Sequence, residues 1–255
     1  MSDIDILLHG IPGRSSHGYL GQASAVLVNK TTMVDVGSIG RRPVLEKSFE
    51  NVDVEPEDVE DVLLTHVHFD HCDNIDLFPD ATIHVYEPEM QRLEDGEYDW
   101  ATPIQGPSLF DGHEVSLFEA GDVINGMEVV PTPGHTEHHV AFVLEDDDLT
   151  YGFTGDAVKN TRELSTMNPM VLYSKEAAID TLERMAERLD FVVPGHDTPF
   201  YIEDGEPIAT IDVDWGVNLQ FSPASATTTE ISSNRSELRE LPPNVTDATA
   251  RQAFH

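Results

Sequence analysis

Residues 65–71, "THVHFDH", place four side chains that commonly bind metals directly after the apolar run "VLL". His66 and His68 alternate, so on an extended segment both imidazoles can bind one metal ion. Asp70 and His71 follow as the chain turns, and they can face a second ion. Imidazole and carboxylate ligands suit zinc, iron or manganese, and the absence of thiolate ligands argues against a closed structural zinc site. We therefore interpret this string as a metal site.

Three further candidate ligands also follow apolar, strand-like segments. They are His135 in "TPGHT", Asp156 in "TGDA" and His196 in "PGHD". Side chains at the ends of strands can converge on one edge of a sheet, where the rigid core fixes their geometry. His84 and His113 have no such neighbours in the sequence, and we interpret them as structural residues.

The segments that must position these ligands are predicted to be mainly strands. Alternating or continuous apolar residues predict strands within 4–8, 24–37, 62–65, 81–86, 113–134, 140–156 and 211–221. A helix is predicted over 174–190 with Ser174 as its N-cap, and weaker helix signals begin near Pro43 and Pro88. Strands outnumber helices and are punctuated by them, so we expect one mixed α/β domain.

The domain is predicted to end near residue 221. The segment 211–221 alternates strictly, and its strand could complete a sheet within the chain or pair with a partner. We therefore assign residues 1–221 to a catalytic domain. Residues 222–255 are rich in Ser, Thr and Pro, which predicts a mobile C-terminal tail.

The charge of the chain is strongly acidic, with 48 acidic and 14 basic residues and a net charge of -34. The acidic residues are dispersed in short pieces, which favours adaptation to a very salty cytoplasm over an ordinary acidic enzyme. At low salt this surface repels nucleic acid and anionic membranes, whereas at about 1 M salt a Debye length of about 3 Å weakens the repulsion. Nucleic acid is therefore a disfavoured partner, although high salt leaves it open.

The location of the protein is predicted from segments that the sequence lacks. Cys72 is the single cysteine, so no disulfide can form within the chain, and we interpret it as a small packing residue. The start "MSDIDILLHG" does not resemble a signal peptide, and no window approaches 18 apolar residues. We expect a soluble, cytoplasmic protein with no membrane partner.

The motifs resemble those of the metallo-β-lactamase superfamily of metallohydrolases, in order and spacing, from about residue 4 to 205. The resemblance implies an αββα four-layer sandwich with the metals at one edge of its two sheets. It also implies a ligand assignment: His66, His68 and His135 on one metal, Asp70, His71 and His196 on the other, and Asp156 bridging them.

The chemistry implied is hydrolysis by two metal ions, expected to be zinc, with iron or manganese as alternatives. Two metals about 3.5–4 Å apart can share a hydroxide, because they lower the pKa of water towards about 7. That hydroxide would attack a carbonyl carbon or a phosphorus atom. Asp70 is the candidate for orienting the nucleophile and carrying its proton, in addition to binding metal.

Two subgroups share further sequence with this chain. The motifs "HVHFDHC", "GDA" and "GHD" resemble the N-acyl homoserine lactonases, which usually have a tyrosine where this chain has Lys159. The segments "NIDLFPDATIHV" and "VVPGHDTPFYI" resemble stand-alone metallo-β-lactamase-domain-containing proteins, some of which are ribonucleases. The second likeness covers more of the chain, so we favour that subgroup.

Candidate substrate contacts are fewer. The glycine-rich segment 10–22 could form a flap over the metals, with Arg14, His17 and Tyr19 as contacts. His139 could reach the substrate or support a ligand. Lys159 could bind a carboxylate or phosphate group of the substrate, or remain solvated.

Three functions follow. Hydrolysis of a small ester, lactone or thioester is favoured by the acidic surface and the compact length. A ribonuclease would need Arg14, Arg41 and Arg42 to cluster beside the site. A mononuclear iron dioxygenase acting on a persulfide would hold iron at one site only, and the second-site ligands Asp70 and His196 weigh against it.

Overall fold

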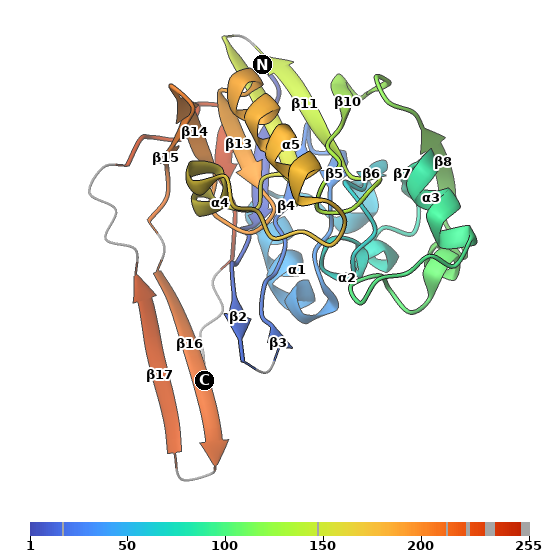
Figure 1. Cartoon of the computed structure of the whole chain (residues 1–255). Helices are drawn as coiled ribbons and strands as arrows, with labels where there is room; N and C mark the ends of the chain where they lie inside the picture. Colours follow the sequence, from blue (N-terminus) through green and yellow to red (C-terminus); the bar gives the residue numbers. More distant parts are fainter. Residues whose placement is uncertain (17, 147, 213, 223–224, 233–237, 251–255) are drawn as a thin grey trace.

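Two sheets packed face to face form the centre of the molecule, and helices cover both outer faces (Figure 1). The computed structural model describes the chain except for residues 17, 147, 213, 223–224, 233–237 and 251–255, and it describes residues 14–15, 214–222 and 225–232 as backbone only. The predicted αββα sandwich is therefore confirmed. No helix in the described part of the chain has the length and apolarity to cross a membrane.

The first sheet has seven strands in the order β18-β1-β4-β5-β6-β7-β8. Its strands are β1 (Ile4–Leu8), β4 (Ala25–Val28), β5 (Thr32–Val34), β6 (Asp61–Leu63), β7 (Thr82–Tyr86), β8 (Glu114–Phe118) and β18 (Val245–Asp247). The strands from β5 to β8 run parallel, which requires crossover connections. These connections include α1 (Arg42–Asn51), α2 (Phe69–Cys72) and α3 (Glu87–Glu94).

The second sheet also has seven strands, in the order β15-β14-β13-β12-β11-β10-β9. Its strands are β9 (Val123–Ile124), β10 (Met127–Pro131), β11 (Val140–Asp146), β12 (Leu149–Gly155), β13 (Phe191–Pro194), β14 (Phe200–Glu203) and β15 (Glu206–Ala209). The strands predicted within 140–156 are confirmed as β11 and β12, which pair antiparallel as a hairpin. Helices α4 (Thr161–Thr166) and α5 (Lys175–Arg188) lie between β12 and β13 along the chain.

Shorter elements complete the described chain. Four 3₁₀ helices are formed by η1 (Ile39–Arg41), η2 (Pro56–Asp58), η3 (Ile75–Leu77) and η4 (Gly106–Phe110). A small hairpin near the N-terminus pairs β2 (Arg14–Ser15) with β3 (Gly18–Tyr19).

The predicted helices form for the expected local reasons. Ser174 caps α5 by accepting a hydrogen bond from the Ala177 amide, and the apolar stripe with Leu182 and Met185 is buried. A proline stands in the first turn of both α1 and α3, where it interrupts no helical hydrogen bond. The three helices predicted from the sequence are therefore confirmed.

Three apolar layers hold the four structural layers together. The middle layer, with Ile6, Phe142 and Phe153, lies between the two sheets. A second layer packs α1 and α3 against the first sheet, and a third packs α4 and α5 against the second sheet. The sheets are thus buried on both faces, which gives a rigid support for residues at the strand ends.

The C-terminal segment differs from its prediction. Strand β18 pairs in parallel with β1, and Val245 and Ala248 are buried. The domain boundary near residue 221 and the mobile tail are therefore wrong for residues 238–250. The physical reason is that β1 would otherwise be an open edge of the sheet, and three residues suffice to cover it although their composition gives no strand signal.

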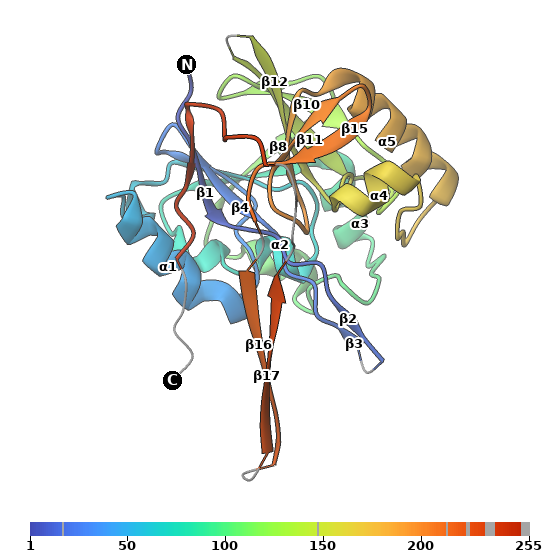
Figure 2. The same cartoon turned by 90° about the vertical axis from the view of Figure 1, so that its left-hand side faces the viewer.

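The predicted strand at 211–221 is β16 (Asp214–Ser222), which pairs with β17 (Ser225–Ser232). This two-stranded sheet joins neither of the large sheets. Figures 1 and 2 show the hairpin extending away from the body of the molecule. Of the two alternatives, completion of a main sheet by this strand is therefore excluded within the described chain.

The role of the C-terminal segment can be tested at Asn244. Its side chain accepts a hydrogen bond from the Tyr151 hydroxyl and donates one to the Ser2 carbonyl, both at 2.9 Å. We expect Asn244→Ala to lower the free energy of unfolding by about 1–3 kcal/mol, because one buried and one partly buried hydrogen bond are lost. Urea unfolding measures this loss. The exposed Gln105→Ala is the control, and an equal, small effect of both changes would contradict the packing of this segment.

Candidate metal centre

The candidate ligands lie at one edge of the sandwich, where several strands end. His66 and His68 follow β6, His135 follows β10, Asp156 directly follows β12, and His196 follows β13. The strands β10, β12 and β13 run in the same direction, so their carboxyl ends share one edge of the second sheet. Helix α2 carries the remaining two candidates, Asp70 and His71. The structure therefore brings together all seven residues proposed from the sequence.

The ligand atoms form three groups, and within each group they lie within 4.8 Å of one another. The groups are His66, His68 and His135; Asp70, His71 and His196; and His66, His71 and Asp156. The first group is compact, because His68 Nδ1 lies 2.9 Å from His66 Nε2 and 3.1 Å from His135 Nε2.

Asp156 links the two sides of the cluster. Its Oδ2 lies 3.0 Å from His135 Nε2, and its Oδ1 lies 2.9 Å from His196 Nε2 and 3.2 Å from His71 Nε2. One oxygen therefore faces the first group and the other faces the second. Gly195 allows this approach, because a Cβ at that position would lie 2.5 Å from Asp156 Oδ1.

The burial of the cluster fits metal binding. All seven side chains are at most 5% exposed. Three of their polar atoms, Asp70 Oδ2, His71 Nε2 and Asp156 Oδ1, are buried without a hydrogen-bond partner in the described chain. An unsatisfied buried polar group costs about 1–3 kcal/mol, and a cation between these atoms would remove that cost. The donor set of imidazoles and carboxylates suits zinc, iron or manganese.

The outward ring nitrogen of each histidine has a partner. The pairs are His66 Nδ1 with Thr65 Oγ1, His68 Nε2 with Asp99 Oδ2, His71 Nδ1 with Asp35 Oδ2, His135 Nδ1 with Lys159 Nζ, and His196 Nδ1 with the Gln22 carbonyl. Such partners fix the orientation of a ligand ring and direct its other nitrogen inward. Each histidine ring of the cluster is therefore held in orientation by a group outside the cluster.

Asp35 was not predicted from the sequence. It follows β5, and its carboxylate accepts hydrogen bonds from the Thr65 amide and hydroxyl at 2.9 and 2.8 Å. The same carboxylate lies 2.7 Å from His71 Nδ1. The available signal was an acidic residue after an apolar strand, in "TMVDVG", which has the same pattern as the ligand segments.

Asp99 was also missed, and it gives a weaker signal because no regular element precedes it closely. Its Oδ1 accepts hydrogen bonds from the Ala101 and Thr102 amides at 2.8 and 2.9 Å, while Oδ2 lies 2.9 Å from His68 Nε2. Although burial raises the pKa of this carboxyl, its hydrogen bond to His68 lowers the pKa below the usual value overall. Asp99 therefore remains ionised and holds His68 in place.

The surroundings of the cluster shift the pKa values of its histidines in different directions. Burial lowers the pKa values of His66 and His135 well below normal, so both rings are neutral near pH 7 and offer lone pairs. Burial would also lower the pKa of His71, but Asp35, Asp70 and Asp156 raise it well above normal. In the protein without metal, His71 thus carries a proton that a metal ion would replace.

Two predicted substrate contacts support the cluster from behind. Lys159 is 3% exposed; its Nζ lies 2.9 Å from His135 Nδ1 and donates to the Met170 carbonyl at 2.8 Å. Its ammonium therefore does not face the pocket, contrary to its predicted role. His139 is buried and accepts a hydrogen bond from the Asp156 amide at 3.1 Å, which corresponds to the supporting role left open above.

Of the three predicted flap contacts, Tyr19 alone has a described side chain. Tyr19 lines the pocket beside the cluster, and its hydroxyl lies 3.2 Å from His196 Nε2. His17 lies outside the described residues, and the side chain of Arg14 is not described either.

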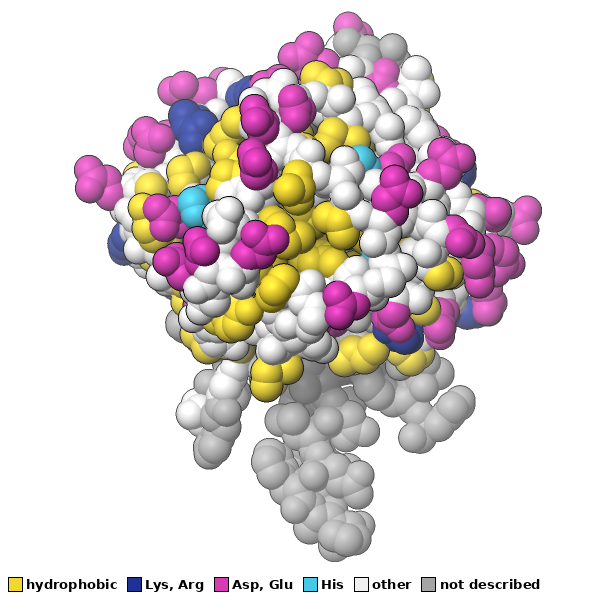
Figure 3. Space-filling model, turned by 90° about the vertical axis from the view of Figure 1, so that its right-hand side faces the viewer, with side chains coloured by type: hydrophobic (Ala, Val, Ile, Leu, Met, Phe, Trp, Pro, Cys, Tyr) yellow, Lys and Arg dark blue, Asp and Glu magenta, His cyan; other side chains and the backbone are white. Residues whose placement is uncertain are grey.

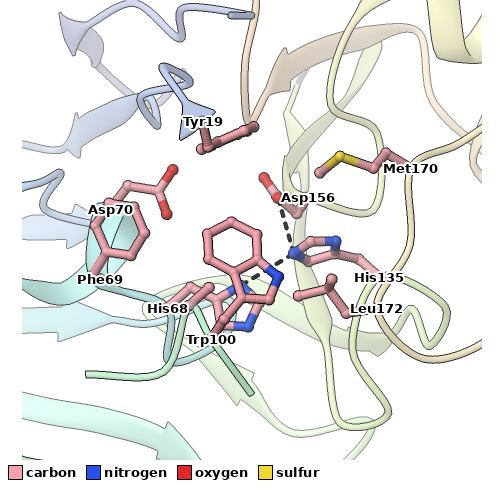
Figure 4. A pocket seen from close by; sticks show the side chains of 10 residues that line it. Tyr19, His68, Phe69, Asp70, Trp100, His135, Asp156, Met170 and Leu172 are labelled. Carbon is pink, nitrogen blue, oxygen red and sulfur yellow. Dashed lines mark hydrogen bonds and ion pairs between the residues drawn. The ribbon is translucent and has the colours of Figure 1, made fainter. Parts of the chain in front are cut away.

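The pocket in front of the cluster has an apolar wall. Figure 4 shows its lining side chains, among which Asp70 and Asp156 come from opposite sides. The apolar and aromatic members of the lining are Tyr19, Phe69, Trp100, Ala101, Met170 and Leu172. Of these side chains only Tyr19 was predicted. Phe69 lies within the histidine and aspartate string, in α2, but an apolar residue there gave no functional signal. Trp100 is 60% exposed, so the wall opens to solvent at its rim.

This sandwich with a buried histidine and aspartate cluster at its edge defines a metallohydrolase. The sequence profile of the metallo-beta-lactamase superfamily matches residues 18–196. The chain therefore belongs to the metallo-β-lactamase superfamily, and the family predicted from the motifs is confirmed.

Curated relatives have names that agree with this family. Metallo-beta-lactamase domain-containing protein 1 of Xenopus laevis is 28% identical over 173 residues, which cover 68% of each chain. A probable metallo-hydrolase of Methanocaldococcus jannaschii is 24% identical over 194 residues, which cover 71% of this chain and 90% of the relative. The resemblance to metallo-β-lactamase-domain-containing proteins is thus also confirmed.

Solved structures share the fold. A protein of Thermotoga maritima described as a metallo-beta-lactamase superposes with a TM-score of 0.63 at 24% identity, covering 78% of this chain and 99% of that one. An N-acyl homoserine lactone hydrolase superposes with a TM-score of 0.59 at 16% identity, covering 77% and 92%. At these identities the likeness concerns the fold alone.

The role of Asp99 can be tested by Asp99→Asn. The amide oxygen can still accept from the loop amides, but its NH₂ group then faces the His68 ring N–H, so the ring loses its acceptor. We expect metal affinity to fall by about 10–100-fold, as for other partners of ligand histidines. Competition with a chelator measures this. The exposed Asp111→Asn is the matched control, and an affinity equal to that of the control would show that Asp99 does not orient His68.

Proposed function

We propose that the protein is a dinuclear metal-dependent hydrolase of a small neutral ester, lactone or thioester. The observation that carries the proposal is the position of Asp156, with one carboxylate oxygen towards each ligand group. His66, His68 and His135 would hold one metal ion, Asp70, His71 and His196 the other, and Asp156 both. Zinc is the proposed metal, with iron and manganese as alternatives.

The residues of the chain divide the remaining tasks. Bound metal ions would lower the pKa of a shared water and so supply the hydroxide nucleophile. Asp70 lines the pocket, and its Oδ2 lies 3.5 Å from His196 Nε2. With two oxygens it can hold a metal with one and orient the attacking water, or accept its proton, with the other. Trp100, Met170 and Leu172 form part of the apolar wall beside this chemistry.

The charges around the pocket favour a neutral substrate over RNA. Within the described side chains, Arg42 is paired with Asp76, and Arg41 Nη1 bonds to backbone carbonyls. Lys159 faces His135 and backbone oxygens, so no described cation lines the pocket. Phosphodiester binding depends on lysine and arginine contacts. Figure 3 shows acidic side chains scattered over one face of the molecule around a central apolar area, with few basic ones.

The remaining alternative, a mononuclear iron dioxygenase, is disfavoured by the second ligand group. The ligand atoms of Asp70, His71 and His196 lie within 4.8 Å of one another, as those of the first group do. A lactone is a suitable first substrate for tests, since one protein with this fold is named as an N-acyl homoserine lactone hydrolase.

The proposal predicts two metal ions per active chain. We expect protein dialysed against a chelator in high salt to lose ester, lactone and thioester hydrolysis, and activity to return with a break at two zinc ions per chain. Elemental analysis and a titration of activity measure this. His196→Ala should bind one ion, because the second group loses a ligand, while the control His113→Ala should still bind two.

Two outcomes would contradict the proposal. A break at one iron ion per chain would favour the dioxygenase. Faster hydrolysis of a phosphodiester than of any carbonyl substrate would favour the ribonuclease.

A further inference from the structure

Tyr19 reaches the metal centre from a segment distant in the sequence. It belongs to β3 of the N-terminal hairpin, 177 positions before His196. Its ring contacts two others, with centroid distances of 5.7 Å to His196 and 5.9 Å to Trp100, both edge-on. Aromatic rings in this arrangement attract each other, so the phenol is held in a fixed direction.

The base of the hairpin is bonded to the metal centre itself. Ile11 and Gln22 exchange two backbone hydrogen bonds of 2.8 and 3.0 Å below the hairpin. The carbonyl of the same Gln22 lies 3.0 Å from His196 Nδ1 and accepts its proton. The position of Tyr19 is therefore set relative to His196 from two sides, by the ring contact and by the backbone.

The hydroxyl of Tyr19 lies on the pocket side of the second ligand group. It is 3.2 Å from His196 Nε2, the nitrogen that also lies 2.9 Å from Asp156 Oδ1. Figure 4 shows Tyr19 across the pocket from His68, with Asp70 and Asp156 on either side. A substrate oxygen that enters between Asp70 and Asp156 comes within reach of this hydroxyl.

The other lining side chains do not offer an equivalent group. Among the ten described residues that line the pocket, Tyr19 has the only hydroxyl. Lys159, at the position where lactonases usually have a tyrosine, bonds to Met170 and faces His135. Carbonyl hydrolysis requires a donor aimed at the oxygen that becomes negative in the transition state.

We propose that Tyr19 is a catalytic residue that donates a hydrogen bond to the carbonyl oxygen of the substrate. The inference rests on the proposed hydrolysis of an ester, lactone or thioester. As hydroxide bonds to the carbonyl carbon, the π electron pair moves to the oxygen, and the Tyr19 O–H stabilises that charge while keeping its proton. The π bond then reforms as the bond to the leaving group breaks, and the departing alkoxide or thiolate takes up the proton of the former hydroxide, carried by Asp70.

The test is Tyr19→Phe, which keeps the ring contacts and removes only the hydroxyl. We expect kcat to fall by about 10²–10³-fold with little change in KM, because the hydrogen bond forms in the transition state. Metal content should stay at two ions per chain. The matched control is Tyr173→Phe, an exposed tyrosine whose hydroxyl bonds to Glu137. An unchanged kcat, or loss of metal from Tyr19→Phe, would overturn the proposal.

A second measurement separates this inference from the proposed function. An alkyl methylphosphonate anion imitates the tetrahedral oxyanion, and calorimetry on zinc-loaded protein gives its affinity without turnover. We expect Tyr19→Phe to bind it more weakly by about the factor lost in kcat, while a carboxylate product binds equally to both proteins. Equal phosphonate affinities would overturn the role of Tyr19. If the unaltered protein hydrolyses no carbonyl substrate, the proposed function fails while the phosphonate comparison still tests Tyr19.

Discussion

The structure depends on the burial of five imidazoles and two carboxylates at one edge of a sandwich. Removing these groups from water costs free energy, and neighbouring groups of the same charge raise that cost further. The protein compensates by placing Asp156 among His71, His135 and His196, so that opposite charges and hydrogen bonds oppose the burial. Although burial raises the pKa of Asp156, these histidines and Lys159 lower it well below normal overall. A metal ion would complete this compensation for the atoms that still have no partner.

The surroundings of the cluster follow from that requirement. Asp35, Asp99 and Lys159 come from three different parts of the chain, and each fixes one ligand ring from outside. Their positions are fixed because the sheets, which are buried on both faces, hold the strand ends rigidly. Glycine at 155, with φ 45°, and at 195 lets two strand ends meet around Asp156 without side-chain interference.

The pocket and the surface differ in polarity. The surface is acidic, whereas the wall in front of the cluster is apolar and contains no described cation. In the reaction proposed above, a neutral substrate would leave water for such a wall at little electrostatic cost, and the few polar groups at its base would stabilise the charge that develops during hydrolysis. The apolar wall and the phenol of Tyr19 are thus complementary parts of one proposed reaction site.

The sequence by itself determined the candidate ligands and most of the framework. The string around His66 to His71, the strand-end motifs at His135, Asp156 and His196, and the alternation of the strands are local patterns that carry their chemistry with them. Tertiary structure alone decided that Lys159 faces His135, that Asp99 holds His68, that Tyr19 reaches His196, and that β18 covers β1. These facts depend on distances between segments far apart in the chain, and local composition and periodicity do not encode such distances.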